Sequence, residues 1–144
     1  MIRNERQYRI TKAQAGKFAR TIADMTASPN RSLHPVLRRA ELDGLKSQME
    51  DLRKELLEYE ALRSGNRRLT ALASIEELPR TLIQARIAAG LSQEELATRL
   101  GLKPQQVQRY EATNYRSASL ERVNQIVRVL GVKLRRPAEL RLVS

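Results

Sequence analysis

The chain has 144 residues, which suits one domain or a small domain with an appendage. Its formal net charge of +11 and its isoelectric point near 10.8 favour a polyanionic partner. The chain contains no cysteine, which excludes disulfide bonds and thiolate metal sites, and no apolar run approaches the roughly 20 residues of a membrane-spanning helix. Because the N-terminus also lacks the apolar core of a signal peptide, we expect a cytoplasmic protein without a cofactor and without membrane contact.

The first predicted element is a helix over residues 11–27. Thr11 and Gln14 have the spacing of a capping box, and the segment 28–30 contains the proline and polar residues that end the helix. Its apolar positions recur at helical spacing and form one stripe: Ala15, Phe18, Ile22 and Met25. The stripe predicts an amphipathic helix that packs on another element.

A longer helix is predicted from Pro35 to Ser64, with Gly65 as its end. Six apolar residues, alternately three and four positions apart, form the seam of a coiled coil: Leu42, Leu45, Met49, Leu52, Leu56 and Tyr59. At about 1.5 Å per residue, this helix is about 45 Å long and the first about 25 Å. A hairpin of the two helices is therefore expected to cover only about half of the longer seam.

The partner of the remaining seam stays open among three possibilities. In the first, the two helices form an intramolecular hairpin that also packs on the following domain. In the second they join two copies of the chain, and in the third they bind a dedicated protein partner. We favour a homodimer, and we assign residues 1–64 as the dimerisation or partner-binding region. Residues 65–74 are the predicted linker because turn residues and a basic pair interrupt the heptads there.

A second domain is predicted over residues 75–134, followed by a tail over residues 135–144. Residues 74–77 have the pattern of a capping box for a short turn. Pro79 then suits the opening of a helix that ends near Ala89.

Residues 91–111 carry most of the functional information in the chain. Ser92 can cap a short helix, Gly101 follows the last apolar position of that helix, and Pro104 suits the first turn of the next one. Two short helices joined by a tight turn are the unit that lays its second helix, here residues 104–111, into the DNA major groove. The positions predicted to face inward are Leu96, Leu100, Val107 and Tyr110.

A last helix is predicted between Ser119, its cap, and Gly131, its end. Its apolar positions are expected to face the core of the domain: Leu120, Val123, Ile126 and Leu130.

A set of residues in this region is characteristic of a known family: Gln93 to Ala97, Leu100 to Leu102, Val107, Tyr110 and Glu111. With these residues the chain resembles the phage repressor and Cro helix-turn-helix family, also called the XRE family, over about residues 78–131. The resemblance implies an all-α fold in which a compact C-terminal domain of four or five helices follows the N-terminal hairpin or coiled coil. It also implies a largely buried ion pair between Arg86 and Glu111 that bridges the first and third helices of the domain.

The loop after the second helix departs from the family pattern. In the family a glycine commonly follows the position of Glu111 closely, whereas residues 112–118 contain no glycine and have one residue more. The register of phosphate contacts carried over to this loop therefore stays open.

The resemblance and the outward side chains together predict a DNA site. By resemblance, Gln93 binds backbone phosphate at a helix N-terminus, where exposed N–H groups favour an anion. Gln105 and Gln106 present amides that can pair with adenine, and Arg109 can fork onto guanine. The remaining candidates for phosphate contacts are Lys103, Tyr115 and Arg116.

The predicted function is a nucleoid-associated regulator of transcription, a dimeric repressor on double-stranded DNA whose operator is pseudo-palindromic with half-sites about 34 Å apart. The alternative is an antitoxin whose N-terminal helices bind a toxin while the C-terminal domain regulates the operon, a layout that resembles HigA-type antitoxins. An enzyme is not expected. The only histidine, His34, is better explained as a helix-entry residue, and the acidic pairs 76–77 and 94–95 by capping and the helix dipole.

Overall fold

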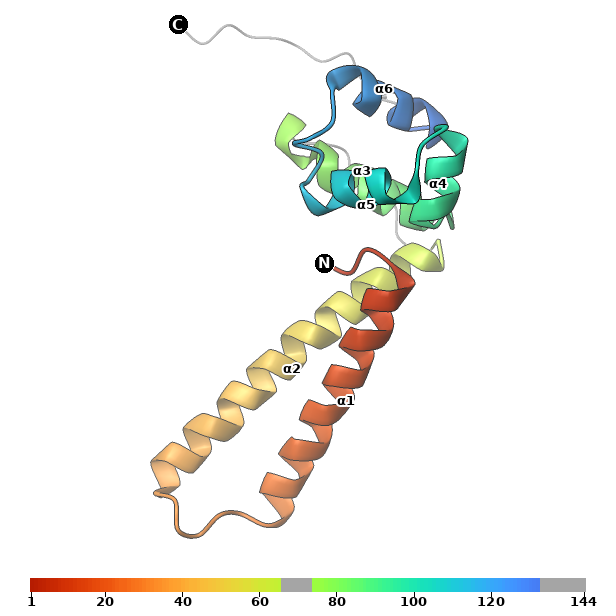
Figure 1. Cartoon of the computed structure of the whole chain (residues 1–144). Coiled ribbons are helices and arrows are strands. Elements are labelled where there is room, and N and C mark those ends of the chain that lie inside the picture. Colours follow the sequence, from red (N-terminus) through yellow and green to blue (C-terminus); the bar gives the residue numbers. More distant parts are fainter. Residues whose placement is uncertain (66–73, 133–144) are drawn as a thin grey trace, which may run out of the picture. The chain divides into compact units, whose positions relative to one another are not determined.

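The computed structural model describes residues 1–65 and 74–132 (Figure 1). These residues form six α-helices and one short 3-10 helix, and they contain no strand. The predicted all-α class is confirmed.

The chain divides into two compact units, residues 1–68 and residues 69–144, called here the N-terminal unit and the C-terminal unit. Most of the predicted linker at 65–74 and the whole predicted tail at 135–144 lie outside the described residues.

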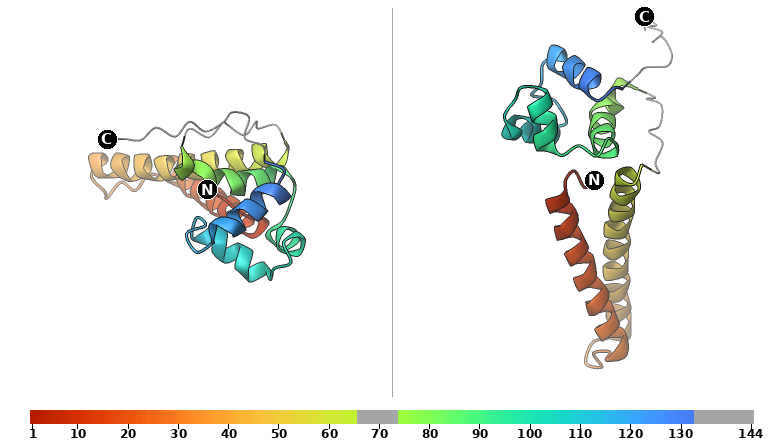
Figure 2. Two further views of the ribbon diagram at one scale, coloured as in Figure 1. Left: turned by 90° about the horizontal axis from the view of Figure 1, so that it is seen from above. Right: turned by 90° about the vertical axis from the view of Figure 1, so that its right-hand side faces the viewer.

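The N-terminal unit is a hairpin of two helices, α1 (Glu5–Ala27) and α2 (Pro35–Arg63), which lie side by side in Figure 1 and in the right-hand view of Figure 2. The ring of Tyr8 stacks on that of Tyr59, with centroids 5.3 Å apart. Two ion pairs join the same ends of the helices, Arg63 with Glu5 at 2.8 Å and the amino group of Met1 with Glu55 at 2.9 Å. The predicted helical hairpin thus forms within one chain.

Helix α1 begins at Glu5, and the capping box predicted at Thr11 is wrong. The side chain of Asn4 caps the helix instead, since it accepts a hydrogen bond from the backbone N–H of Gln7 at 2.9 Å. The stacking of Tyr8 on Tyr59 of α2 holds residues 5–10, the part of α1 that precedes the predicted start, against α2. With 23 and 29 residues, the two helices are about 34 Å and 43 Å long, so α1 covers more of the seam than predicted.

Helix α2 begins where the sequence predicts. The Nδ1 atom of His34 accepts a hydrogen bond from the backbone N–H of Val36 at 3.3 Å, and Pro35 occupies the first turn, where its missing N–H costs nothing. His34 is therefore a helix-entry residue.

The hairpin buries little of its apolar surface. No residue from Arg3 to Glu58 is buried, and the apolar seams of both helices are only partly covered. Four large apolar side chains of this unit are more than half exposed: Ile10, Val36, Leu37 and Leu57. Because burial of apolar surface is the main term that stabilises a fold, the single hairpin leaves much of this stabilisation unused.

The C-terminal unit contains the shorter helical elements, η1 (Ile75–Glu77), α3 (Leu78–Ala88), α4 (Gln93–Arg99), α5 (Pro104–Ala112) and α6 (Leu120–Val129). Its core includes four aliphatic side chains that are at most 1% exposed: Leu82, Leu96, Val107 and Ile126. Three of these, on α4, α5 and α6, are positions that the sequence predicts to face inward.

Two local predictions in this unit are wrong. Leu120 is 74% exposed, because it is the first residue of α6 and stands directly after the cap, Ser119, whose hydroxyl accepts from the N–H of Arg122. Ser74 precedes η1, but its side chain makes no capping hydrogen bond.

Glycines end two of these helices as predicted. Gly90 and Gly101 follow α3 and α4 with φ angles of +70° and +67°, a region that L-residues rarely adopt. A Cβ atom at either position would meet no atom within 4 Å, so the backbone angle alone requires glycine.

Candidate nucleic-acid interface

A reciprocal capping box fixes the start of α4. The hydroxyl of Ser92 accepts from the backbone N–H of Glu95 at 3.1 Å, and the carboxylate of Glu95 accepts from the backbone N–H of Ser92 at 2.7 Å. The backbone N–H of Ser92, and next the hydroxyl of Ser92, hold the pKa of the Glu95 carboxyl below the ordinary range of a glutamate. The predicted cap is confirmed, and the first helix of the motif has a defined direction.

Helix α5 begins at Pro104, with Lys103 as its cap residue. The side-chain oxygen of Gln106 accepts from the backbone N–H of Lys103 at 3.1 Å, which closes the first turn. Val107 is buried in the core, as predicted, and Tyr110 is half-buried. These contacts determine which side of α5 faces solvent.

The solvent side of α5 and its cap residue carry four of the side chains predicted from the sequence to contact DNA. Lys103, Gln105, Gln106 and Arg109 are all exposed. The side chains of Gln105 and Arg109 make no hydrogen bond or ion pair to any residue in the two described ranges. Gln108 is exposed as well and extends this surface, although sequence reasoning left it out.

A buried ion pair holds α5 against α3. The Nε and Nη2 atoms of Arg86 bind the two carboxylate oxygens of Glu111 at 2.6 Å and 2.8 Å, and Nη1 of Arg86 donates to the carbonyl of Leu91 at 2.7 Å. The side chains of Arg86 and Glu111 are 3% and 0% exposed. The predicted pair is confirmed, with the bidentate geometry that gives such pairs their directional strength.

Gln93 belongs to this buried cluster, and the phosphate contact expected of it stays a prediction. Its Nε2 atom donates to Glu111 at 2.7 Å, and the residue is only 8% exposed. The amide expected to bind phosphate is therefore already used inside the domain, where it gives the carboxylate of Glu111 a third donor.

Tyr115 is likewise not on the surface, which corrects its selection as a phosphate contact. The residue is 5% exposed, and its ring stacks on that of Tyr110 with centroids 6.4 Å apart. Its hydroxyl is buried without a hydrogen-bond partner among the described residues. Burial, and next the negative charge of Glu111, raise the pKa of Tyr115.

The loop that follows α5 makes its turn without glycine. Asn114 and Tyr115 both adopt positive φ angles, 49° and 59°. This pair of left-handed residues turns the tyrosine ring into the domain and takes the place of the glycine common in the family pattern.

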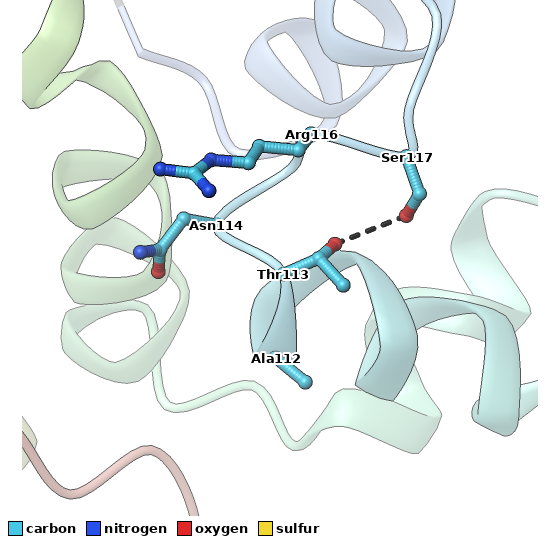
Figure 3. A pocket seen from close by; sticks show the side chains of 5 residues that line it. All are labelled: Ala112, Thr113, Asn114, Arg116 and Ser117. Atoms are coloured by element: carbon cyan, nitrogen blue, oxygen red, sulfur yellow. Dashed lines mark hydrogen bonds between the residues drawn. The ribbon is translucent and has the colours of Figure 1, made fainter.

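The outer side of the same loop forms a shallow hollow, drawn in Figure 3. It is lined by Ala112, Thr113, Asn114, Arg116 and Ser117. The hydroxyls of Thr113 and Ser117 are 3.0 Å apart, and the side chains of Asn114 and Arg116 point to the same side of the loop (Figure 3). A guanidinium beside amide and hydroxyl groups suits a phosphate oxygen, so the exposed Arg116 remains a good candidate.

Within residues 1–65 and 74–132, no group of three or more His, Cys, Asp or Glu residues has the arrangement to hold a metal ion. No helix in the described part of the chain is both long and apolar enough to cross a membrane.

The helix-turn-helix family model matches residues 82–136, which include α4 and α5 with most of α3 and all of α6. The comparisons with curated proteins and with solved structures give no match. The family match confirms the resemblance stated from the sequence for this segment.

Proposed function

We propose that the chain is a dimeric repressor that reads double-stranded DNA with α5, on the premise that residues 82–136 match the helix-turn-helix family, the DNA-binding unit of transcriptional regulators. The observation that carries the proposal is the exposed, unpaired side of α5, with Gln105 and Arg109 available for a partner. The buried pair of Arg86 and Glu111 fixes the orientation of this helix, so the reading side chains project from a rigid base.

Each exposed side chain has a role that follows from its chemistry. Gln105 presents its amide to adenine, Gln106 does so when its oxygen leaves the N–H of Lys103, and Arg109 donates two hydrogen bonds to the O6 and N7 atoms of guanine. Lys103 and Arg116 bind backbone phosphates and thereby set the register of the domain on the duplex. Gln93 and Tyr115 are not part of the proposed contact set because both are buried.

The proposal includes a second copy of the chain. One small domain contacts few base pairs, so useful affinity needs two domains on half-sites about one helical turn, or 34 Å, apart. The partly covered seams of α1 and α2 supply apolar surface through which two copies can associate. The operator is then expected to be pseudo-palindromic.

The second candidate is an antitoxin, and the partly covered hairpin favours it as well. A hairpin in which no residue from Arg3 to Glu58 is buried is as suitable for a toxin as for a second copy. The C-terminal unit keeps its DNA-binding role in both cases.

The test is a specificity profile of Arg109→Ala on the site selected by the full-length protein from random duplex DNA. We expect a loss of about 1–3 kcal/mol on that site and relaxed preference at one base pair. Lys103→Ala should instead weaken binding to all sequences by a similar factor and reduce the salt dependence.

Arg128→Ala is the matched control, since Arg128 is an exposed arginine of the same domain on α6 and should leave base preference unchanged. If Arg109→Ala keeps both the affinity and the base preference of the unmodified chain, α5 is not the reading helix.

A further inference from the structure

The solvent side of α1 carries a row of basic residues, called here the α1 basic face and defined as Arg6, Arg9, Lys17 and Arg20. At about 100° per residue, the four side chains fall within a sector of about 80°, roughly opposite the apolar stripe that contains Phe18 and Ile22. All four are exposed. From Arg6 to Arg20 the row is about 21 Å long.

These four charges are not compensated within the hairpin. None of them forms an ion pair with a carboxylate in the described part of the chain. Helix α1 has two acidic residues. Glu5 is bound to Arg63 at 2.8 Å, and Asp24 lies in the same sector one turn beyond Arg20 but forms no ion pair among the described residues. By contrast, Arg39 and Lys54 of α2 lie 3.9 Å from Asp43 and Asp51.

We propose that the α1 basic face binds the phosphate backbone of the duplex whose bases are read by α5. The inference rests on the proposed DNA-binding function and adds a second contact surface, on the other unit of the chain. A row of about 21 Å along the axis of B-DNA passes roughly six phosphates of one strand, so four cations have enough partners. Three of the four are arginines, whose planar forks match phosphate oxygens.

The chemistry of this face favours a nucleic acid over other polyanions. An amphipathic helix that lies on a membrane needs a row of large apolar side chains free to enter the lipid, but the apolar stripe of α1 is packed in part on α2, and beside the basic face only Ile10 is a large apolar side chain that is more than half exposed. A protein interface of useful affinity usually has aromatic or large aliphatic anchors, and between these basic positions the same sector carries only Ala13. A surface that is basic from Arg6 to Arg20 and has no apolar anchor between these residues suits a partner that is recognised through charge.

The length of the chain between the two units supports a shared duplex. Only eight residues, 66–73, separate the described parts, and a chain of that length spans at most about 30 Å. Once α5 is bound, the α1 basic face is held at high effective concentration near the same DNA.

The test compares two double variants of the full-length chain that remove the same charge. Arg9→Gln with Arg20→Gln removes two charges of the α1 basic face, and Arg39→Gln with Lys54→Gln removes two charges that already have carboxylate partners. Glutamine resembles arginine and lysine in helix propensity, so both variants should keep the helix content of the hairpin, which circular dichroism checks. The probe is a random-sequence duplex of roughly 30 base pairs.

We expect the slope of log affinity against log salt to become shallower by about 0.9 for each lost phosphate contact, hence by roughly 1–2 for Arg9→Gln with Arg20→Gln. The control pair should change the slope by much less. Base preference on the selected site should be the same in both variants, which separates this surface from α5.

The outcomes distinguish this inference from the proposed function. If the unmodified chain binds the duplex and both double variants keep its slope, the α1 basic face does not contact DNA, and the role of α5 is untouched. If the unmodified chain binds no duplex at all, both proposals fail. If Arg9→Gln with Arg20→Gln keeps the DNA slope but abolishes binding to vesicles rich in phosphatidylserine, the face binds membranes and the inference is overturned.

Discussion

At the residue scale, the carboxylate of Glu111 organises the C-terminal unit. It accepts hydrogen bonds from Arg86 on α3 and from Gln93 on α4, while its own backbone belongs to α5. One buried group therefore joins three helices. The direction in which α5 presents its outer side therefore depends on a contact that is buried inside the unit.

Replacement of Glu111 by glutamine should show how strongly the domain depends on this group. Glu111→Gln leaves the guanidinium of Arg86 buried without a counter-charge, which typically costs about 3–5 kcal/mol. Denaturant unfolding of the full-length chain measures the loss in the C-terminal unit. Glu121→Gln, an exposed carboxylate on α6, should stay within about 0.5 kcal/mol of the unmodified protein.

A double variant that removes both charges of the pair separates the cost of an unpaired buried charge from the cost of changed packing. In Arg86→Met with Glu111→Leu no buried charge remains, so this double variant should be more stable than Glu111→Gln alone. A loss below about 1 kcal/mol for the single variant would mean that the pair contributes little to the fold.

Sequence reasoning identified the ion pair but not all of its neighbours. Arg86 and Glu111 stand at positions where the family pattern places such a pair, so their contact was predictable. Gln93 and Tyr115 are polar residues next to predicted surface positions, and nothing in the sequence shows that one binds Glu111 and the other turns inward. That turn depends on two consecutive positive φ angles, at Asn114 and Tyr115, which residues other than glycine seldom adopt.

At the scale of the elements, the same substitution should have opposite effects at two glycines. Gly101→Ala places a Cβ atom on a residue with a φ of +67° and should destabilise the C-terminal unit by about 1–2 kcal/mol. Gly44→Ala should stabilise α2 by up to about 1 kcal/mol, because Gly44 is inside the helix and no atom lies within 4 Å of the added Cβ.

Thermal unfolding at one fixed protein concentration measures both changes, since association would otherwise shift the midpoint. Equal signs for the two variants would contradict the backbone explanation.

The boundaries of the elements were predictable where capping chemistry is local. Ser92, Pro104 and Ser119 begin helices, and Gly101 follows the end of one, as their positions in the sequence indicate. The start of α1 was missed because Thr11 fits a cap as well as Asn4 does. The choice between them depends on the stacking of Tyr8 on a ring far away in the sequence, which no local pattern contains.

At the scale of the whole molecule, the partly covered hairpin predicts association. We expect the full-length chain to sediment as two copies at micromolar concentration, because the partly covered seams of α1 and α2 gain burial when a second copy packs on them. Leu45→Asn with Leu52→Asn should convert it to one copy and lower the affinity for an operator with two half-sites. Lys46→Asn, an exposed neighbour on the same helix, is the control.

A single copy at every concentration tested would contradict the dimer. Tight co-purification of that single copy with a toxin encoded beside it would then support the antitoxin alternative. The helical pattern predicted the two helices and their pairing, but it did not identify the molecule that covers them. Any apolar surface of the right width can cover a seam, so the spacing of the apolar residues does not identify the partner.

The stacked rings described above also give the protein two built-in optical labels. The chain has no tryptophan, and its four tyrosines form two pairs, Tyr8 with Tyr59 in the N-terminal unit and Tyr110 with Tyr115 in the C-terminal unit. Ultraviolet emission from each pair can therefore be followed without energy loss to an indole. Replacing Tyr8 and Tyr59 with phenylalanine silences one unit, and the remaining signal reports when the other melts or meets its ligand.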